Sequence, residues 1–270
     1  MKLFVISCSY HAQISQLSAY LALKHLPGIT ELIFLWDDLL PNLENQPEPH
    51  KFINKNVINF SSFQSVNLIQ DGWIRQQIVK LQLHHITNDE SFYVLDGDTL
   101  LRNTIDLRPN KVLGNFDVCY QPYFDFITNE LKLKKLTDFS FISPLLLLER
   151  NVLTQLEQYC HSIYGYDIAN LYLNTVAKYP SRSFSECELY GTFATQILNK
   201  HYEPIVNPFK NVYSQNQSTD RLETLFFSTN DSLVLYGCDM YVDKQFWRNL
   251  APIYRDFSAF KIGFADTFYP

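Results

Sequence analysis

Phe92-Tyr93-Val94-Leu95-Asp96-Gly97-Asp98-Thr99-Leu100 has the pattern of a buried strand that runs directly into two aspartates. In open α/β sheets, ligands bind beyond the carboxyl ends of the strands. A glycine between the aspartates lets the backbone turn sharply while both carboxylates point toward one spot, and such oxygen ligands suit a hard divalent cation. The alternative is an Asp-Gly hairpin turn with two solvated acids. The spacing of Asp96 and Asp98 alone leaves both interpretations open.

The segments before this stretch alternate between strand-like and helix-like patterns, as in a parallel sheet covered by helices. We expect strands at residues 3–7, 32–36, 57–60 and 92–95, and helices at 12–25 and 72–86. In the second half we expect a strand at 117–121 and helices at 145–159, 167–177 and 187–199. The pattern after Pro204 is weak and predicts loops and short strands. No internal repeat or linker divides the sequence, so we expect a single α/β domain over residues 1–270.

The composition agrees with one folded unit. Of the 270 residues, 46% are hydrophobic and 15% are aromatic, which is enough to form a core without disulfides or a structural metal. The formal net charge of -6 argues against a nucleic-acid binder, since such proteins normally carry a basic face. The five cysteines include no CxxC pair and are odd in number, so we expect reduced thiols, mostly in the core.

The sequence predicts a cytoplasmic protein. The apolar stretch Leu3–Ile6 near the start is shorter than the roughly 7–15 residues of a signal-peptide core. No apolar run approaches the roughly 20 residues that a membrane-spanning helix needs. Peripheral association with a membrane is left open.

A second segment precedes the aspartates, Gly72-Trp73-Ile74-Arg75-Gln76-Gln77-Ile78-Val79-Lys80-Leu81. On a helix, one face would carry the residues that pack on the sheet, namely Ile74, Ile78, Leu81 and His85. A second stripe beside it would carry Trp73, Gln77, Lys80 and His84. Arg75 points elsewhere, and we expect it on the surface.

A third segment, Ser185-Glu186-Cys187-Glu188-Leu189-Tyr190-Gly191, has the pattern of a helix start. Ser185 and Glu188 form a capping box, in which the serine side chain binds the Glu188 amide and the glutamate binds back to the Ser185 amide. This role accounts for Glu188. Glu186 has no such local role and is the freer carboxylate.

Together the three segments resemble a little-characterised bacterial family that is assigned to the GT-A glycosyltransferase fold. Its pattern is GWxxQQ…KL, then a DxD motif, then SExELYG. The match spans roughly residues 1 to 200 in order, and three spaced motifs are more specific than DxD alone. The resemblance implies a Rossmann-type mixed sheet flanked by helices, with a nucleotide-sugar-binding half at about 1–110. A less regular, acceptor-binding half would follow at about 111–270.

The resemblance implies a metal-dependent glycosyltransferase that moves a sugar from a nucleotide-diphosphate donor to a hydroxyl acceptor, in surface polysaccharide or glycoconjugate synthesis. Mn²⁺ or Mg²⁺ would be held mainly by Asp98, with Asp96 on the ribose or acting through a water and Gly97 between them. His201 would be a third metal ligand, as late histidines are in some GT-A enzymes; the alternative is a surface histidine.

The other residues of the implied donor site come from two regions. Ser7, Tyr10 and His11 follow the first strand, where this fold usually receives the nucleoside. In the second segment, residues that contact the nucleotide or diphosphate would be Trp73, Gln77 and Lys80, with His84 a weaker candidate. For each, the alternative is an ordinary structural role, such as a solvated lysine or a tryptophan at the edge of the core.

For the acceptor, an inverting enzyme needs a base within hydrogen-bond reach of the attacking hydroxyl, whereas a retaining one does not need it in that form. We expect Glu186 to be that base or to orient the acceptor, with Glu188 in reserve. Pure helix capping is the alternative for both.

Three other classes can be compared with the sequence. Phosphatases of the haloacid dehalogenase type need DxDx[T/V], but Leu100 holds the Thr/Val position. A nucleotidyltransferase normally has a glycine-rich basic loop after the first strand, and Ser7–Gln13 has no Gly, Lys or Arg. A non-catalytic glycan- or protein-binding module with the same fold remains open. In the glycosyltransferase hypothesis an acidic protein binds an anionic diphosphate beside two aspartates, which makes a divalent cation a requirement.

Overall fold

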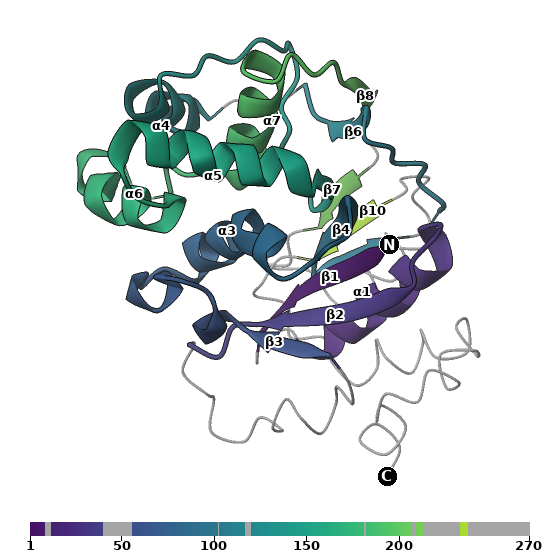
Figure 1. Cartoon of the computed structure of the whole chain (residues 1–270). Helices are drawn as coiled ribbons and strands as arrows, with labels where there is room; N and C mark the ends of the chain where they lie inside the picture. The colour runs from purple at the N-terminus through teal and green to yellow at the C-terminus, as the bar shows by residue number, and fades with distance from the viewer. Residues whose placement is uncertain are drawn as a thin grey trace.

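In the computed structural model of the protein, the residues described are 1–8, 12–39, 56–101, 103–116, 120–180, 182–206, 209–212 and 233–236. A five-stranded sheet has the order β3-β2-β1-β4-β7 (Figure 1). Its strands are β1 (Lys2–Ser7), β2 (Glu31–Trp36), β3 (Val57–Asn59), β4 (Ser91–Asp96) and β7 (Leu145–Glu149). The first four are parallel, and β7 is antiparallel to β4. The expected class, a mixed α/β sheet flanked by helices, is confirmed.

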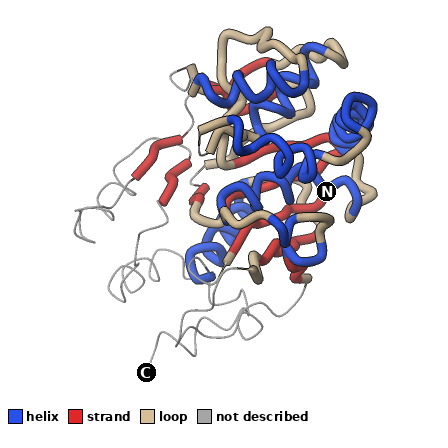
Figure 2. Tube along the Cα trace, turned by 90° about the vertical axis from the view of Figure 1, so that its left-hand side faces the viewer, coloured by secondary structure: helices blue, strands red, loops and turns tan. Residues whose placement is uncertain are grey.

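The central strands are apolar on both faces because helices cover both. On β1, Leu3 and Val5 pack toward α1 (Ala12–His25), whereas Phe4 and Ile6 belong to the core under α3 (Gly72–Gln82). A strand buried on both sides reads as a continuous apolar run, which is the pattern of parallel sheets. Figure 2 shows the same sheet from another side, with helices around the strands.

The remaining helices lie on the α3 side of the sheet (Figure 1). They are α4 (Gln121–Leu131), α5 (Arg150–Tyr164), α6 (Ile168–Thr175) and α7 (Glu186–Gln196). Short 3₁₀ turns are η1 (Phe60–Ser62), η2 (Val66–Leu68), η3 (Leu83–His85) and η4 (Val176–Lys178). In the described residues no helix has both the length and the apolar character that a membrane span requires.

Two small sheets complete the described part of the chain. One joins β5 (Thr99–Leu101), β10 (Leu233–Tyr236) and β9 (Phe209–Val212), and the other joins β6 (Lys111–Gly114) to β8 (Glu203–Val206). Because β5 follows the two aspartates directly, this pairing anchors the far side of their turn. The short strands that the sequence predicts after Pro204 are therefore present.

The predicted helix at 145–159 is wrong in its first turn, since Leu145–Glu149 is strand β7 and the helix begins at Arg150. A short apolar run does not by itself distinguish a buried strand from a buried helix. The predicted strand at 117–121 is also wrong at its end: residues 117–119 lie outside the described residues, and Gln121 begins α4 with Pro122 in its first turn. The other predicted helices agree with α1, α3, α6 and α7 within a few residues.

Arg75 is buried, which corrects the expectation that it lies on the surface. Its Nη2 lies 2.9 Å from Asp37 Oδ2 and its Nε lies 3.2 Å from both carboxylate oxygens. Its Nη1 donates to the carbonyls of Ile69 and Gln70 at 3.0 and 2.9 Å. The guanidinium thus fixes the first turn of α3 to the residue that follows β2.

Replacing Arg75 with Met should lower the free energy of unfolding by about 3–5 kcal/mol, because the Asp37 carboxylate is left buried without its cation. The pair's side chains are only 4% and 5% exposed. Urea denaturation measures the loss. Arg108→Met is the matched control: its ion pair with Asp106 is 63% and 56% exposed, and its loss should leave the free energy of unfolding nearly unchanged. Equal losses in the two variants would contradict the assignment.

Candidate functional site

The turn Asp96-Gly97-Asp98 lies at the carboxyl end of β4, between β4 and β5, as the sequence predicts. A Cβ added to Gly97 would lie 2.0 Å from the Ile6 carbonyl oxygen and 2.3 Å from Ser15 Oγ, so only glycine fits there. The Gly97 carbonyl also accepts a hydrogen bond from Ser18 Oγ at 2.8 Å. The turn is therefore fixed against both β1 and α1, which gives the two aspartates a defined position.

The three sequence motifs meet at the side chain of Lys80. Its Nζ lies 2.7 Å from Asp96 Oδ1 and 2.7 Å from Glu186 Oε1. The Glu186 amide in turn donates to Gln77 Oε1 at 3.1 Å. The Lys80 and Glu186 side chains are only 3% and 6% exposed, whereas Asp96 is 25% exposed. Four of the predicted site residues, from α3, β4 and α7, are thus in one connected group.

At the start of α7, one of the two hydrogen bonds of the predicted capping box is present. Ser185 Oγ accepts a hydrogen bond from the Glu188 amide at 3.3 Å, as predicted. The Glu188 carboxylate, however, does not serve as the reciprocal cap: it is fully buried and accepts a hydrogen bond from the Ser140 hydroxyl. Gly191 lets α7 approach Phe141 closely, since an added Cβ would lie 2.1 Å from that ring. Glu188 therefore ties α7 to the loop around Ser140.

The charges in this group are not balanced. Burial alone would lower the pKa of Lys80, but the charges of Asp96 and Glu186 outweigh it and hold that pKa above its ordinary value. Burial and the neighbouring charge of Asp96 raise the pKa of Asp98 to about 7. One ammonium thus contacts two carboxylates, and Asp98 beside Asp96 adds a third carboxyl group. Two carboxylates in one partly exposed turn, with too little positive charge beside them, are a donor set that fits a hard divalent cation.

The aromatic residue Trp73 lies at the edge of this group. Its ring is stacked with Tyr123 of α4 at a centroid distance of 6.4 Å, and the Arg182 guanidinium lies 5.7 Å from the Trp73 ring. Burial and the charge of Glu186 raise the pKa of Tyr123 to about 12. Sequence reasoning missed Tyr123, and the signal that could have found it is Pro122, a residue typical of a helix start.

Other predicted residues have different positions. Ser7 is buried, and its hydroxyl donates to Ser15 Oγ at 3.0 Å beneath the turn. His84, predicted to share a stripe with Lys80, contacts Glu157 of α5 instead, and His85, predicted to pack on the sheet, is half exposed. Tyr10 and His11 lie outside the described residues.

His201 is exposed and precedes β8. Within the described ranges, the single group of three close metal-ligand side chains is His84, His85 and Glu157, which does not include His201. The structure therefore gives no further support to His201 as a third ligand of the aspartate turn.

The chain was compared with known proteins. No protein-family model matches it, and a search of curated proteins gives no significant match. Among solved structures it is similar to mouse xyloside xylosyltransferase 1 in its apo form, with 12% identity and a TM-score of 0.48 over 90% of this chain and 100% of that one. It is similar to the galactosyltransferase LgtC in complex with donor and acceptor sugar analogues, with 14% identity and a TM-score of 0.43 over 92% and 94%. The bifunctional glycosyltransferase WbbM matches with 8% identity and a TM-score of 0.48 over 90% of this chain but only 46% of its own.

The raised pKa of Asp98 predicts a pH-dependent stability. An unfolded chain releases this proton near pH 4, whereas the folded protein keeps it until about pH 7, so the contribution of Asp98 to stability falls as pH rises through that window. Asp98→Asn should therefore stabilise the metal-free protein at pH 8 and much less at pH 5. A pKa raised this far would correspond to about 4 kcal/mol in a fully buried group, and partial exposure reduces the expected gain to about 1–2 kcal/mol.

Thermal unfolding in the presence of a chelator measures this difference. Asp106→Asn is the control, because Asp106 is exposed and pairs with Arg108. It should give no gain at pH 8. An Asp98→Asn effect of the same size at pH 5 and pH 8 would contradict the assigned protonation.

Proposed function

We propose that this chain is a metal-dependent glycosyltransferase that moves a sugar from a nucleotide-diphosphate donor to a hydroxyl acceptor. The observation that carries the proposal is the contact of Lys80 with both Asp96 and Glu186, because it joins the three motifs of the resemblance in one group at the carboxyl edge of the sheet. Ligands bind at this edge in open α/β sheets. The proposed acceptor is a glycan hydroxyl in surface polysaccharide or glycoconjugate synthesis, and the proposed compartment is the cytoplasm.

The donor end of the proposed site is the aspartate turn. Asp98 and Asp96 would hold Mn²⁺ or Mg²⁺, and the ion would supply the positive charge that stabilises the diphosphate leaving group. Gly97 keeps the backbone of the turn close to β1, so both carboxylates remain at the strand end. Their oxygen donors favour a hard cation over a softer one.

Lys80 has a different role in this proposal from the one expected of it. Its ammonium is buried and bonded to two carboxylates, so it acts as a positioning residue rather than as a direct contact to the diphosphate. By binding Asp96 and Glu186 together, it sets the donor-side carboxylate and the acceptor-side carboxylate at a fixed separation. Gln77 supports this arrangement through the amide of Glu186.

The acceptor end would be formed by Glu186 and the aromatic pair of Trp73 and Tyr123. Because Glu186 Oε1 is already bonded to Lys80, an acceptor hydroxyl would approach the other carboxylate oxygen. Aromatic side chains bury large apolar surfaces and suit the face of a sugar or a base, and Trp73 and Tyr123 are stacked on each other. Glu186 would accept or orient the proton of that hydroxyl.

The donor hypothesis predicts metal-dependent nucleotide binding. In calorimetry, at least one of UDP, GDP, CDP and TDP should bind about tenfold or more tightly with Mn²⁺ than without it, since the cation relieves the repulsion between diphosphate and aspartates. Asp98→Ala should remove the Mn²⁺ dependence, and Asp106→Ala, at an exposed site, should keep it. Binding that responds neither to Mn²⁺ nor to Asp98→Ala would refute the proposed metal site.

Catalysis is tested by release of free nucleotide from a panel of donor sugars. Glu186→Gln keeps the size of the side chain and an oxygen for Lys80, and should lower turnover by about 10²-fold or more while leaving nucleotide binding intact. Glu203→Gln, an exposed glutamate, is the control and should keep turnover. Wild-type turnover in Glu186→Gln would remove Glu186 from the reaction, and metal-dependent binding without turnover of any donor would identify a binding module.

A further inference from the structure

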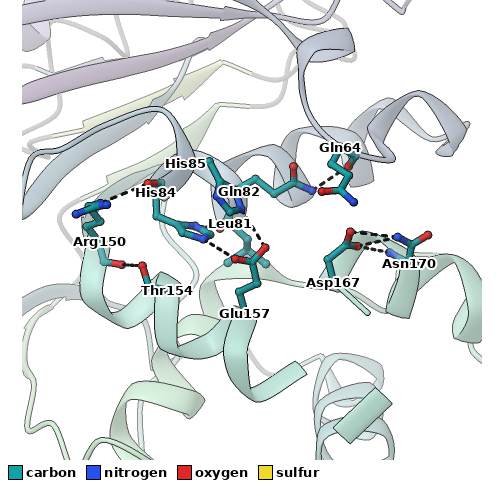
Figure 3. Close-up of polar contacts among 10 residues, drawn as sticks. All are labelled: Gln64, Leu81, Gln82, His84, His85, Arg150, Thr154, Glu157, Asp167 and Asn170. Atoms are coloured by element: carbon teal, nitrogen blue, oxygen red, sulfur yellow. Dashed lines mark hydrogen bonds and ion pairs between the residues drawn. The ribbon is translucent and has the colours of Figure 1, made fainter. Parts of the chain in front are cut away.

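A second polar cluster joins the end of α3 to α5. His84 Nε2 lies 3.0 Å from Glu157 Oε2, and His85 Nε2 lies 3.0 Å from Glu157 Oε1. The three ligand-type atoms all lie within 4.8 Å of one another, and the two imidazole rings are 3.9 Å apart. Figure 3 shows both histidines directed at the single carboxylate of Glu157.

This cluster is separate from the aspartate turn. His84 and His85 are in η3, a few residues before β4 begins at Ser91, whereas Asp96 is the last residue of that strand. A strand of this length spans about 20 Å. Arg150, the first residue of α5, donates from its backbone to the Glu90 carbonyl at 2.9 Å and from its Nε to the His84 carbonyl at 3.4 Å. The cluster therefore lies at the amino end of β4, opposite the proposed donor site.

The contacts of His84 leave its Nε2 lone pair directed at Glu157. Its Nδ1 lies 3.0 Å from the Leu81 carbonyl oxygen, which can only accept, so Nδ1 carries the proton. In the neutral ring, the lone pair of Nε2 would then face an ionised carboxylate oxygen at 3.0 Å. This arrangement is satisfied by a second proton on the ring, by a proton on the carboxyl group, or by a cation that binds both atoms.

The same geometry is common among metal ligands. Histidines that bind metals usually donate their other ring N–H to a backbone carbonyl or carboxylate, as His84 does to Leu81. In a tetrahedral zinc site, neighbouring ligand atoms lie about 3.3 Å apart, from bonds of about 2.0–2.2 Å. The observed N···O distances of 3.0 Å differ little from this value. His85 is half exposed, so the cluster is open to solvent on that side.

We propose that His84, His85 and Glu157 form a binding site for a Zn²⁺-type transition-metal ion, which ties η3 to α5. Two imidazole nitrogens and one carboxylate oxygen are ligands that suit zinc better than Mg²⁺ or Ca²⁺, which prefer oxygen alone. With three ligands from the chain, the fourth position is left for water or for a side chain of another protein. The site is independent of the proposed glycosyl transfer.

The test is metal binding to the tag-free full-length protein. Calorimetry should find one Zn²⁺ bound per chain through this cluster, with a rise in Tm, and neither Mg²⁺ nor Ca²⁺ should compete for it. Co²⁺ in its place should give the visible absorption of a tetrahedral nitrogen and oxygen site. His85→Asn should weaken Zn²⁺ binding at least tenfold, and because His85 is half exposed the fold should be unaffected.

Matched variants separate this site from the rest of the protein. His161→Asn, on the exposed side of α5, should bind Zn²⁺ as the wild type does. Glu157→Gln should lose binding but keep the fold, since its amide can donate to a neutral His84 ring. Asp98→Ala should retain the site. Equal Zn²⁺ binding by wild type and His85→Asn, loss of the site in Asp98→Ala, or no binding together with a doubly protonated His84 by NMR would each overturn the proposal.

Discussion

The buried ammonium of Lys80 is the interaction on which the described site depends. Taking a charge out of water costs several kcal/mol, and the attraction of nearby carboxylates offsets this only when the geometry is good. Here the partners come from the end of β4 and the start of α7, each 2.7 Å from the same nitrogen. If α3, β4 or α7 moved, an uncompensated charge would remain in the core. The ion pair therefore fixes three separate elements relative to one another.

Helix α3 is held by polar contacts along its whole length, and each contact reaches a different neighbour. At its start Arg75 binds Asp37 after β2, in its third turn Lys80 binds the β4 and α7 carboxylates, and beyond its end His84 binds Glu157 of α5. Its apolar face packs on the sheet between them. A buried polar group is costly unless its partners lie within hydrogen-bond distance. These contacts therefore specify the position of the helix as well as stabilise it.

The sequence was sufficient for the parts of the site that follow from regular periodicity. It placed the aspartate turn at the end of β4 and grouped Gln77 and Lys80 on one stripe of α3, and these residues do meet Glu186. It failed at His84 and His85, because the helix tightens to a 3₁₀ turn at Leu83 and the spacing of side chains changes from 3.6 to 3.0 residues per turn.

Other failures have a different cause, since they depend on partners far along the chain. The local sequence predicts Arg75 on the surface, but its partner Asp37 is 38 residues away in the chain and holds it in the core. The leucines of β7 are predicted to be helical, but they pair with β4 as a strand. The unbalanced charge of the aspartate turn also depends on distant partners: Lys80 contacts Asp96 and Glu186, and Asp98 adds a third carboxyl group beside Asp96. Folding brings these acids together and lowers the stability of the protein. Destabilising arrangements of this kind are typical of functional sites. In the proposed function, a divalent cation bound at the aspartate turn would relieve the repulsion between these acids.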